Sequence, residues 1–178
     1  MSTWREYTIR KATAEDLPLV LSFRRKLFLE MEIPHEALVP DSAGILRERY
    51  EKEFRQDALA HFIASDATGN PTAIVGVLLK DDFPYHLFKP GAYGWIVDVY
   101  TEPAHRGRGL SRQLLELTLA WLRSKGISEA KLLASGSDAA RLYERSGFRR
   151  TWEFYLPLDE GRTYNDHLND REARRQGR

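Results

Sequence analysis

The chain has 178 residues, of which 42% are hydrophobic and 30% are charged, and its formal net charge is +1. This composition is ordinary for a globular chain, and the length is sufficient for one domain with a buried core. A net charge near zero gives no reason to expect nucleic acid or an anionic membrane as a partner. Cysteine is absent, which excludes disulfides, cysteine-ligated zinc and a cysteine acyl-enzyme.

Neither a membrane span nor a secretory signal is expected. The sequence contains no long apolar run, and residues 1–11 are largely polar and charged. A cytoplasmic protein is therefore the expectation. The histidines at positions 35, 61, 86, 105 and 167 do not pair at the spacing of metal ligands on a helix, so no metal site is expected.

The first part of the chain predicts one strand and two helices. Residues 7–10 have the pattern of a strand. Thr13 followed by Asp16 resembles a capping box and indicates a helix that begins near Asp16 and ends before Pro34. A second helix is predicted at residues 42–54, with Glu and Arg on its exposed face.

Three strands are predicted next, at residues 59–65, 73–79 and 93–101. A turn at residues 68–71 joins the first two. The loop at residues 80–91 is rich in aromatic side chains, which makes it a candidate for ligand contacts.

A third helix is predicted to begin at Leu110 and to end before Gly126. Its apolar residues recur in steps of four, three and four, at Leu110, Leu114, Leu117 and Trp121, with Leu115 and Leu122 broadening the same face. A short strand at 130–134, a short helix at 138–146 and a long strand at 148–158 complete the predicted elements.

The order of these elements predicts an α/β (α+β) fold, with a mixed central β-sheet flanked by helices. The strand–helix–strand unit around the third helix requires a parallel crossover. We expect one domain at 1–158 and a charged, partly helical tail at 159–178, whose arginines are interleaved with acidic residues and indicate no nucleic-acid surface. The strand at 148–158 is a candidate edge for a homodimer.

The segment RGRGLS at residues 106–111 joins a predicted strand to the third helix. Two glycines at this junction let the backbone turn tightly and approach a ligand closely. The first N–H groups of a helix, together with the helix dipole, bind anions, and two arginines flank the turn. The segment is therefore predicted to hold a phosphorylated ligand.

Other interpretations of this glycine turn compete. A mononucleotide P-loop requires Lys and then Ser or Thr after the second glycine, where this chain has Leu110 and Ser111. A dinucleotide-binding fingerprint requires Gly or Ala where this chain has Arg112. An ordinary strand-to-helix turn with solvated arginines is the remaining alternative to a phosphate site.

A second segment changes this balance. It contains Ala139, Leu142-Tyr143 and Gly147-Phe148. Together with Arg106 and Gly109 it resembles the GNAT superfamily of acyl-CoA-dependent N-acyltransferases. In that family an Arg/Gln-x-x-Gly-x-Gly/Ala turn holds the CoA pyrophosphate, and a later Ala-x-x-Leu-Tyr-x-x-x-Gly-Phe corner supplies a tyrosine.

The resemblance spans residues 7–158 and includes two departures from the family pattern. Ser111 stands where the family has Gly or Ala; serine is small, and its hydroxyl can cap the helix or bind phosphate. Gly136 stands where many members have an asparagine.

The resemblance implies an enzyme that moves an acetyl group from acetyl-CoA to a primary amine, by direct attack in a ternary complex. Acetyl-CoA is then the acyl donor, no metal is needed, and the acceptor is a small-molecule or protein amine. A non-catalytic acyl-CoA-binding regulatory module and a nucleotide-binding domain unrelated to CoA are the alternatives.

By resemblance, CoA is held by the backbone of the third of the predicted strands at 59–101, by the glycine turn and by the later helix. The residues are Val99, Thr101, Arg106, Gly107, Arg108, Gly109, Leu110, Ser111, Ala139 and Tyr143.

Tyr143 and Asp98 are the candidate catalytic residues. The resemblance places the Tyr143 phenol near the CoA sulfur, where it protonates the leaving thiolate; a packing tyrosine is the alternative. Asp98 interrupts an apolar strand, where a buried carboxylate is costly unless it has a partner or a function. Asp98 either takes a proton from the acceptor's ammonium or is satisfied by neighbouring backbone or an arginine.

Overall fold

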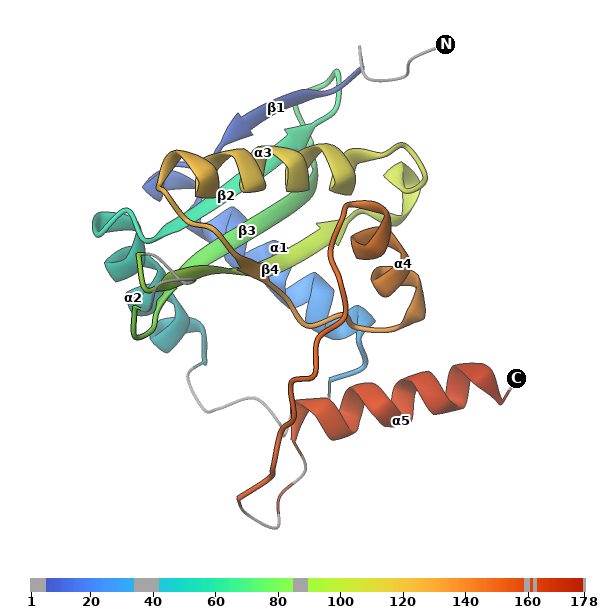
Figure 1. Ribbon diagram of the computed structural model, residues 1–178. Helices are drawn as coiled ribbons and strands as arrows, with labels where there is room; N and C mark the ends of the chain where they lie inside the picture. Colours follow the sequence, from blue (N-terminus) through green and yellow to red (C-terminus); the bar gives the residue numbers. More distant parts are fainter. Residues whose placement is uncertain (1–5, 34–41, 85–89, 159–160, 162, 178) are drawn as a thin grey trace. The chain divides into compact units, whose positions relative to one another are not determined.

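The computed structural model describes residues 6–33, 42–84, 90–158, 161 and 163–177 (Figure 1). The chain divides into two compact units, Met1–Leu132 and Leu133–Arg178. The boundary that we predict at residue 158 differs from this division and stays a prediction. Pro34, the expected end of the first helix, and part of the aromatic loop, residues 85–89, lie outside the described residues.

The first unit contains the sheet and three helices, and the second contains two helices. In chain order the elements are β1 (Thr8–Lys11), α1 (Leu17–Glu30), α2 (Ser42–Arg55), β2 (Leu59–Ser65), β3 (Pro71–Asp81), β4 (Ala92–Thr101), α3 (Leu110–Ser124), β5 (Ala130–Lys131), α4 (Ser137–Arg145) and α5 (Tyr164–Gln176). Short 3-10 turns precede α1 and α3, at Ala14–Asp16 and Pro103–His105.

The five strands form one mixed sheet in the order β1-β2-β3-β4-β5. The first four are antiparallel neighbours, and β5 pairs in parallel with β4 through Gly94 and Trp95. The chain passes through α3 between β4 and β5, as a parallel connection requires. The predicted mixed sheet is therefore confirmed.

Helices cover both faces of this sheet (Figure 1). On one face, a Cβ added to Gly94 of β4 meets the Leu122 side chain of α3 at 2.4 Å, so α3 packs directly on the strand. On the other face, the Asp98 side chain of β4 contacts Arg24 of α1 and Tyr50 of α2. The predicted flanking helices are thus present on both sides.

The core on the α1 and α2 face is built from aliphatic and aromatic side chains that bury completely or nearly so. They include Val20, Phe23, Tyr50, Ile63, Ile74 and Tyr100. Full burial of one large apolar side chain stabilises a fold by roughly 1.5–3 kcal/mol. This layer therefore supplies much of the energy that fixes α1 and α2 against the strands.

On α3 the predicted apolar face is correct except at Leu117, which is 41% exposed, and at Trp121, which is only half-buried. The buried line runs through Leu110, Leu114, Thr118 and Leu122, at steps of four, with Leu115 beside it. Thr118 fits this line because its hydroxyl donates to the Leu114 carbonyl oxygen at 2.8 Å. A hydroxyl can be buried when it has a hydrogen-bond partner, because the bond offsets the cost of removing the group from water.

The strand predicted at 148–158 is wrong. The structure describes this segment without strand pairing, and its alternating apolar residues are exposed: Trp152 by 91%, Phe154 by 92% and Leu158 by 93%. Alternation sets which face a strand presents, but a strand also needs a hydrogen-bonded neighbour, and the described residues provide none here. The homodimer expected through this strand loses that support and stays a prediction.

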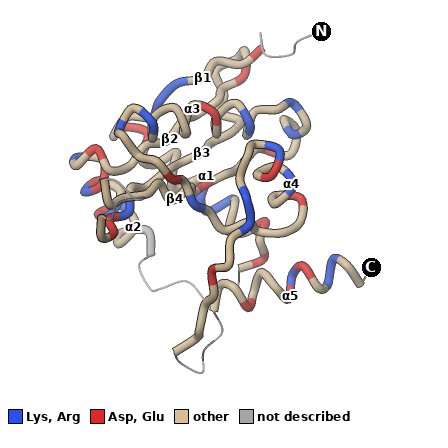
Figure 2. The backbone as a smooth tube through the Cα atoms, in the orientation of Figure 1, with Lys and Arg blue, Asp and Glu red and all other residues tan. Residues whose placement is uncertain are grey.

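The C-terminal segment forms α5, which confirms its partial helicity. Thr163 caps the helix: its hydroxyl accepts from the Asp166 N–H at 3.2 Å, and the Asp166 carboxylate accepts from the Thr163 N–H at 2.8 Å. Figure 2 shows that basic and acidic residues alternate along this helix.

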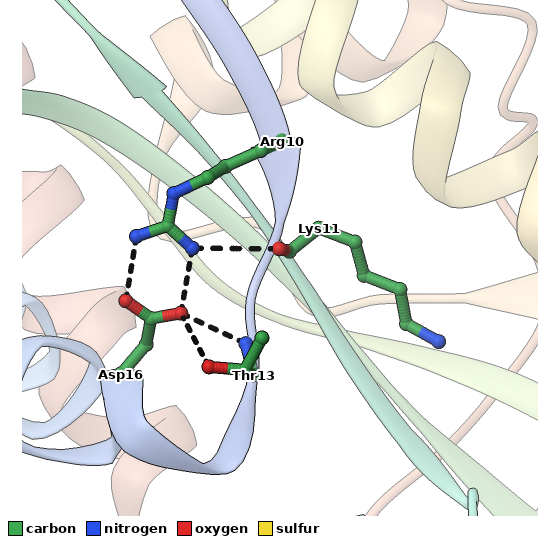
Figure 3. A network of polar contacts seen from close by, with 4 residues as sticks. All are labelled: Arg10, Lys11, Thr13 and Asp16. Carbon is green, nitrogen blue, oxygen red and sulfur yellow. Dashed lines mark hydrogen bonds and ion pairs between the residues drawn. The ribbon is translucent and has the colours of Figure 1, made fainter.

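The predicted capping box forms at the 3-10 turn Ala14–Asp16, which leads directly into α1 (Figure 3). The Asp16 carboxylate accepts from the Thr13 N–H at 2.8 Å and from two Arg10 nitrogens at 2.6 Å each. The hydrogen bond from Arg10 is the main cause that lowers the Asp16 pKa to about 2. β1 and α1 are therefore joined by one carboxylate.

We expect Asp16→Ala to lower the free energy of unfolding by about 1 kcal/mol at pH 7. Because the folded pKa lies below the ordinary value, the contribution is complete above about pH 4 and declines as pH falls through 2. Urea unfolding at several pH values measures it. Glu15→Ala, at a neighbouring exposed position, is the control, and equal losses in both variants at pH 7 would contradict the assignment.

Candidate functional site

The glycine turn joins β4 to α3 through two residues in the left-handed region. Gly107 has φ 74° and Gly109 has φ 77°, values that side chains with a Cβ adopt only at a cost. A Cβ at Gly107 meets nothing within 4 Å, and one at Gly109 meets only the Gln113 amide nitrogen at 3.9 Å. Both glycines are therefore required by the conformation, and the space over the turn is open to a ligand.

The turn delivers the chain to the N-terminus of α3. Gly109 is the N-cap and has no side chain with which to cap the helix. The first N–H groups of an α-helix have no partner within it, so those of Leu110 and Ser111 are suited to bind an anion. The Ser111 hydroxyl lies 2.8 Å from the Thr101 hydroxyl, which ties the helix start to the end of β4.

Arg106 precedes the turn, and its guanidinium is already engaged within the first unit. Nε donates to the Thr101 carbonyl oxygen at 2.9 Å, and the terminal nitrogen forms an ion pair with Glu30 of α1. These contacts brace the turn against β4 and α1. A phosphate contact of the Arg106 side chain stays a prediction and would require exchange of these partners.

Arg108 is the freer of the two turn arginines. Its one described ion-pair contact is a distant one, 3.5 Å to Glu6, and both side chains are substantially exposed. An exposed pair of this kind contributes little to stability and exchanges easily for another anion. Arg108 is therefore better placed than Arg106 to form an ion pair with a phosphate.

β4 contains a bulge near its C-terminal end. The Gly94 N–H donates towards β5, to Glu129 at 2.9 Å, whereas the Glu102 N–H donates towards β3, to Thr72 at 2.8 Å. In a regular strand two residues eight positions apart point to the same side. The reversal shows that one extra residue is inserted between them, and the register with β3 shifts between Ile74 and Gly76.

The bulge determines which backbone groups of β4 are available. After it, the N–H groups of Val99 and Thr101 point away from β3, on the side where β5 would continue. In the part of the chain that the structure describes, β5 pairs only with Gly94 and Trp95. These two N–H groups therefore face an edge with no strand partner, where an extended ligand can bind.

Asp98 occupies the bulge, with φ 54° and a fully buried side chain. Its carboxylate accepts from Arg24 at 2.6 Å, from the Tyr50 hydroxyl at 2.6 Å and from His61 Nε2 at 2.9 Å. Burial raises the pKa of Asp98, but the hydrogen bond from His61 and the charge of Arg24 outweigh it and hold the pKa well below its usual range.

These contacts favour one of the two roles that the sequence leaves open for Asp98. Three donors occupy the carboxylate, and a carboxylate held ionised by an arginine and a histidine is a poor proton acceptor. The geometry thus supports an aspartate satisfied by an arginine. A general-base role of Asp98 stays a prediction without a described contact to support it.

Sequence reasoning did not identify Arg24, Tyr50 and Gly76 as part of this arrangement. Gly76 of β3 makes room for the His61 ring, because a Cβ there would lie 2.4 Å from His61 Nε2. A glycine inside a strand can signal a close approach of another group. Arg24 and Tyr50 give no such signal, since they lie 74 and 48 positions from Asp98.

A second carboxylate and a histidine near the turn also have partners. Glu102 forms an ion pair with Lys26 of α1, and His105 Nδ1 lies 2.8 Å from the Tyr7 hydroxyl. The described residues contain no group of three or more metal-ligating side chains. None of the described helices has the length and apolar composition that crossing a bilayer requires.

The second unit holds the remaining predicted residues, Ala139 and Tyr143, four positions apart on α4. Gly147, with φ 92°, ends this helix in a Schellman motif: its N–H donates to Glu144 at 3.1 Å, and the Phe148 N–H donates to the Tyr143 carbonyl oxygen at 3.0 Å. The Phe148 ring consequently packs edge-on against the Tyr143 ring.

Tyr143 has a buried phenol in a proton-donating state. Burial raises its pKa to about 12, and Tyr164 adds a smaller contribution in the same direction. The hydroxyl therefore stays protonated throughout the neutral range. The predicted CoA residues thus fall in two units, with the turn and strand in the first and Tyr143 in the second.

We expect Asp98→Asn to lower the free energy of unfolding by about 3–5 kcal/mol at pH 7, because the variant leaves the Arg24 charge without its partner. The contribution of a carboxylate with a lowered pKa is present above about pH 4 and is lost as the pH falls below that value. Urea unfolding at pH 7 and at lower pH measures this loss.

Asp57→Asn is the matched control. Asp57 also has a positive φ, but it is 56% exposed and pairs only with surface lysines, so we expect a loss below about 1 kcal/mol. If both variants lost the same amount, Asp98 would not anchor the fold.

Comparisons with known proteins give the site its context. The model of a family described as acetyltransferase (GNAT) matches residues 25–148. A mycothiol acetyltransferase of Thermobispora bispora is 41% identical over 70 residues, which cover 36% of this chain and 24% of that protein. The chain thus spans about a quarter of the length of this relative.

Solved structures share the fold over most of their length. A predicted acetyltransferase of Clostridium acetobutylicum with acetyl-CoA has a TM-score of 0.77 and 26% identity, over 86% of this chain and 96% of that one. AAC(6')-Iy in complex with the bisubstrate analogue CoA-S-monomethyl-acetylneamine has a TM-score of 0.64 and 21% identity, over 87% and 99%.

Proposed function

The chain belongs to the GNAT acetyltransferase family, and from that premise we propose that it transfers an acetyl group from acetyl-CoA to a primary amine. The observation that carries this proposal is the junction of β4 and α3. One bulge leaves the Val99 and Thr101 N–H groups facing an open edge, and the glycine turn that follows leads to an uncapped helix N-terminus.

The two halves of this junction suit the two ends of acetyl-CoA. The helix N-terminus and the turn N–H groups bind the pyrophosphate, with Arg108 as a mobile counter-charge. The exposed β4 edge pairs with the amide-containing pantetheine arm in the manner of an added strand. A space open above Gly107 lets the ligand approach the backbone.

The chemistry is direct attack of the amine nitrogen on the thioester carbonyl carbon within a ternary complex. A lysine-like amine with a pKa of ~10.4 is neutral in about one molecule in 2,500 at pH 7, so its deprotonation requires roughly 4–5 kcal/mol. A base or a chain of water molecules must therefore accept the proton of the ammonium group. Backbone N–H groups at the bulge are suited to stabilise the oxyanion that forms when the amine adds to the carbonyl. Collapse of this intermediate restores the carbonyl, breaks the carbon–sulfur bond and releases the CoA thiolate.

Tyr143 donates the proton that the leaving thiolate needs. Its raised pKa keeps the phenol protonated at neutral pH, where the product thiol, with an ordinary pKa of about 8.5, is also protonated and therefore has to take up a proton after the carbon–sulfur bond breaks. Ala139, one helical turn earlier on α4, is small enough to admit the ligand beside the phenol.

The acceptor we propose is a small-molecule amine. The name of the matched relative, mycothiol acetyltransferase, and the bisubstrate analogue bound to AAC(6')-Iy both describe small acceptors. A non-catalytic acyl-CoA-binding module is not favoured, since these relatives are described as acetyltransferases.

Thiol release from acetyl-CoA across a panel of amines tests the activity. We expect acceptor-dependent release with at least one small amine, and the free CoA to match the N-acetylated product mole for mole. A folded chain that binds CoA but releases none with any amine would instead support the non-catalytic module. Lysine-containing peptides in the same panel compare protein-like with small acceptors.

We expect Tyr143→Phe to lower kcat by about 10²-fold or more at pH 7 with little change in the Kd for CoA, because the acid is lost and the ring remains. The loss should shrink above about pH 9, where the thiolate leaves without a proton. Steady-state kinetics and calorimetry measure these quantities. Tyr155→Phe, in the same unit, is the control, and a large loss of CoA binding in Tyr143→Phe would show a packing role instead.

A further inference from the structure

A non-glycine residue in the left-handed region lies in the middle of β4. Asp98 has φ 54°, a conformation that is unfavourable for residues with a Cβ, although less so for aspartate than for most. The extra residue that Asp98 contributes is also what reverses the direction of the N–H groups after it. The availability of the Val99 and Thr101 N–H groups thus depends on whatever holds Asp98 in place.

Three donors from three different elements hold Asp98. Arg24 comes from α1, Tyr50 from α2 and His61 from β2, and all three bond the same carboxylate. We call Asp98, Arg24, Tyr50 and His61 the clasp. Because its members come from both helices of one layer and from the sheet, the clasp fixes the bulge relative to the whole α1 and α2 face.

The surroundings of the clasp are shaped for these contacts. Gly76 leaves the space that the His61 ring fills. Within the described residues, His61 Nδ1 and Arg24 Nε are buried without a hydrogen-bond partner, and the hydrogen bonds that these two side chains form with Asp98 use His61 Nε2 and an Arg24 terminal nitrogen. Buried groups left partly unsatisfied are costly, and their retention indicates that the arrangement serves more than packing.

We propose that Asp98 is a positioning residue, and that the clasp holds β4 in the bulge that presents the Val99 and Thr101 N–H groups to the pantetheine arm of acetyl-CoA. This inference rests on the proposed function. When the clasp is weakened, β4 relaxes towards a regular register, and these two N–H groups lose their fixed direction. The glycine turn, which binds the nucleotide end, lies beyond β4 and keeps its own brace through Arg106.

Two ligands separate these effects: free CoA, and 3′-phospho-ADP, the nucleotide end of CoA without pantetheine. In Tyr50→Phe, which removes one clasp hydrogen bond and keeps the ring, we expect the Kd for CoA to rise about tenfold. The Kd for 3′-phospho-ADP should change less than twofold. Isothermal titration calorimetry measures both constants, and Tyr93→Phe, five positions before the bulge on β4, is the matched control.

A second variant disturbs the clasp through His61. Gly76→Ala places a Cβ 2.4 Å from His61 Nε2 and displaces the ring without altering Asp98 itself. We expect the same selective loss of CoA affinity, together with faster amide hydrogen exchange at Val99 and Thr101. Equal loss of both ligands in either variant, or loss of neither, would overturn the proposal.

Turnover distinguishes positioning from base catalysis. If Asp98 positions the strand, Asp98→Asn raises the Kd for CoA and leaves the 3′-phospho-ADP affinity intact. If Asp98 is the base, Asp98→Asn abolishes turnover with CoA affinity unchanged, and the clasp proposal is then wrong. A wild-type chain that binds 3′-phospho-ADP and CoA equally well also overturns the clasp, whereas one that binds neither overturns the proposed function as well.

Discussion

A single buried carboxylate connects three structural elements to the strand that carries the candidate site. Asp98 accepts from Arg24, Tyr50 and His61 at 2.6–2.9 Å, and its own backbone is in the left-handed region. Removing one partner of a buried charge pair costs about 3–5 kcal/mol, a large fraction of a domain's stability. The bulge in β4, the direction of the N–H groups after it and the packing of α1 and α2 all depend on this arrangement.

The site divides between rigid support and an open binding edge. Arg106 contacts the Thr101 carbonyl oxygen and Glu30. These contacts fix the residue that precedes Gly107 and Gly109, the two glycines with positive φ. The helix N-terminus and the β4 edge present N–H groups that have no strand or side-chain cap as partner among the described residues. Acetyl-CoA, the ligand that we propose, has a pyrophosphate and an amide-containing arm that suit these two features, and the chain belongs to the GNAT acetyltransferase family.

The sequence was sufficient to predict secondary structure wherever that structure depends on residues close together in the chain. The α3 stripe, the capping box at Thr13 and Asp16 and the strand at 59–65 were predicted within a few residues, because hydrophobic period and capping chemistry act over one or two turns. The strand at 148–158 was not, because its alternation carries no information on whether a neighbour pairs with it.

The sequence by itself determined the glycine turn, the helix that follows it, the Gly147 helix stop behind Tyr143 and the presence of an unusual aspartate in an apolar strand. Only the tertiary structure decided which groups that aspartate contacts and that Arg106 is braced by Glu30. The deciding contacts join residues 37 to 76 positions apart, and no local propensity encodes them. They exist because packing α1 and α2 on one sheet face brings polar groups into a dry layer, where each must find a partner.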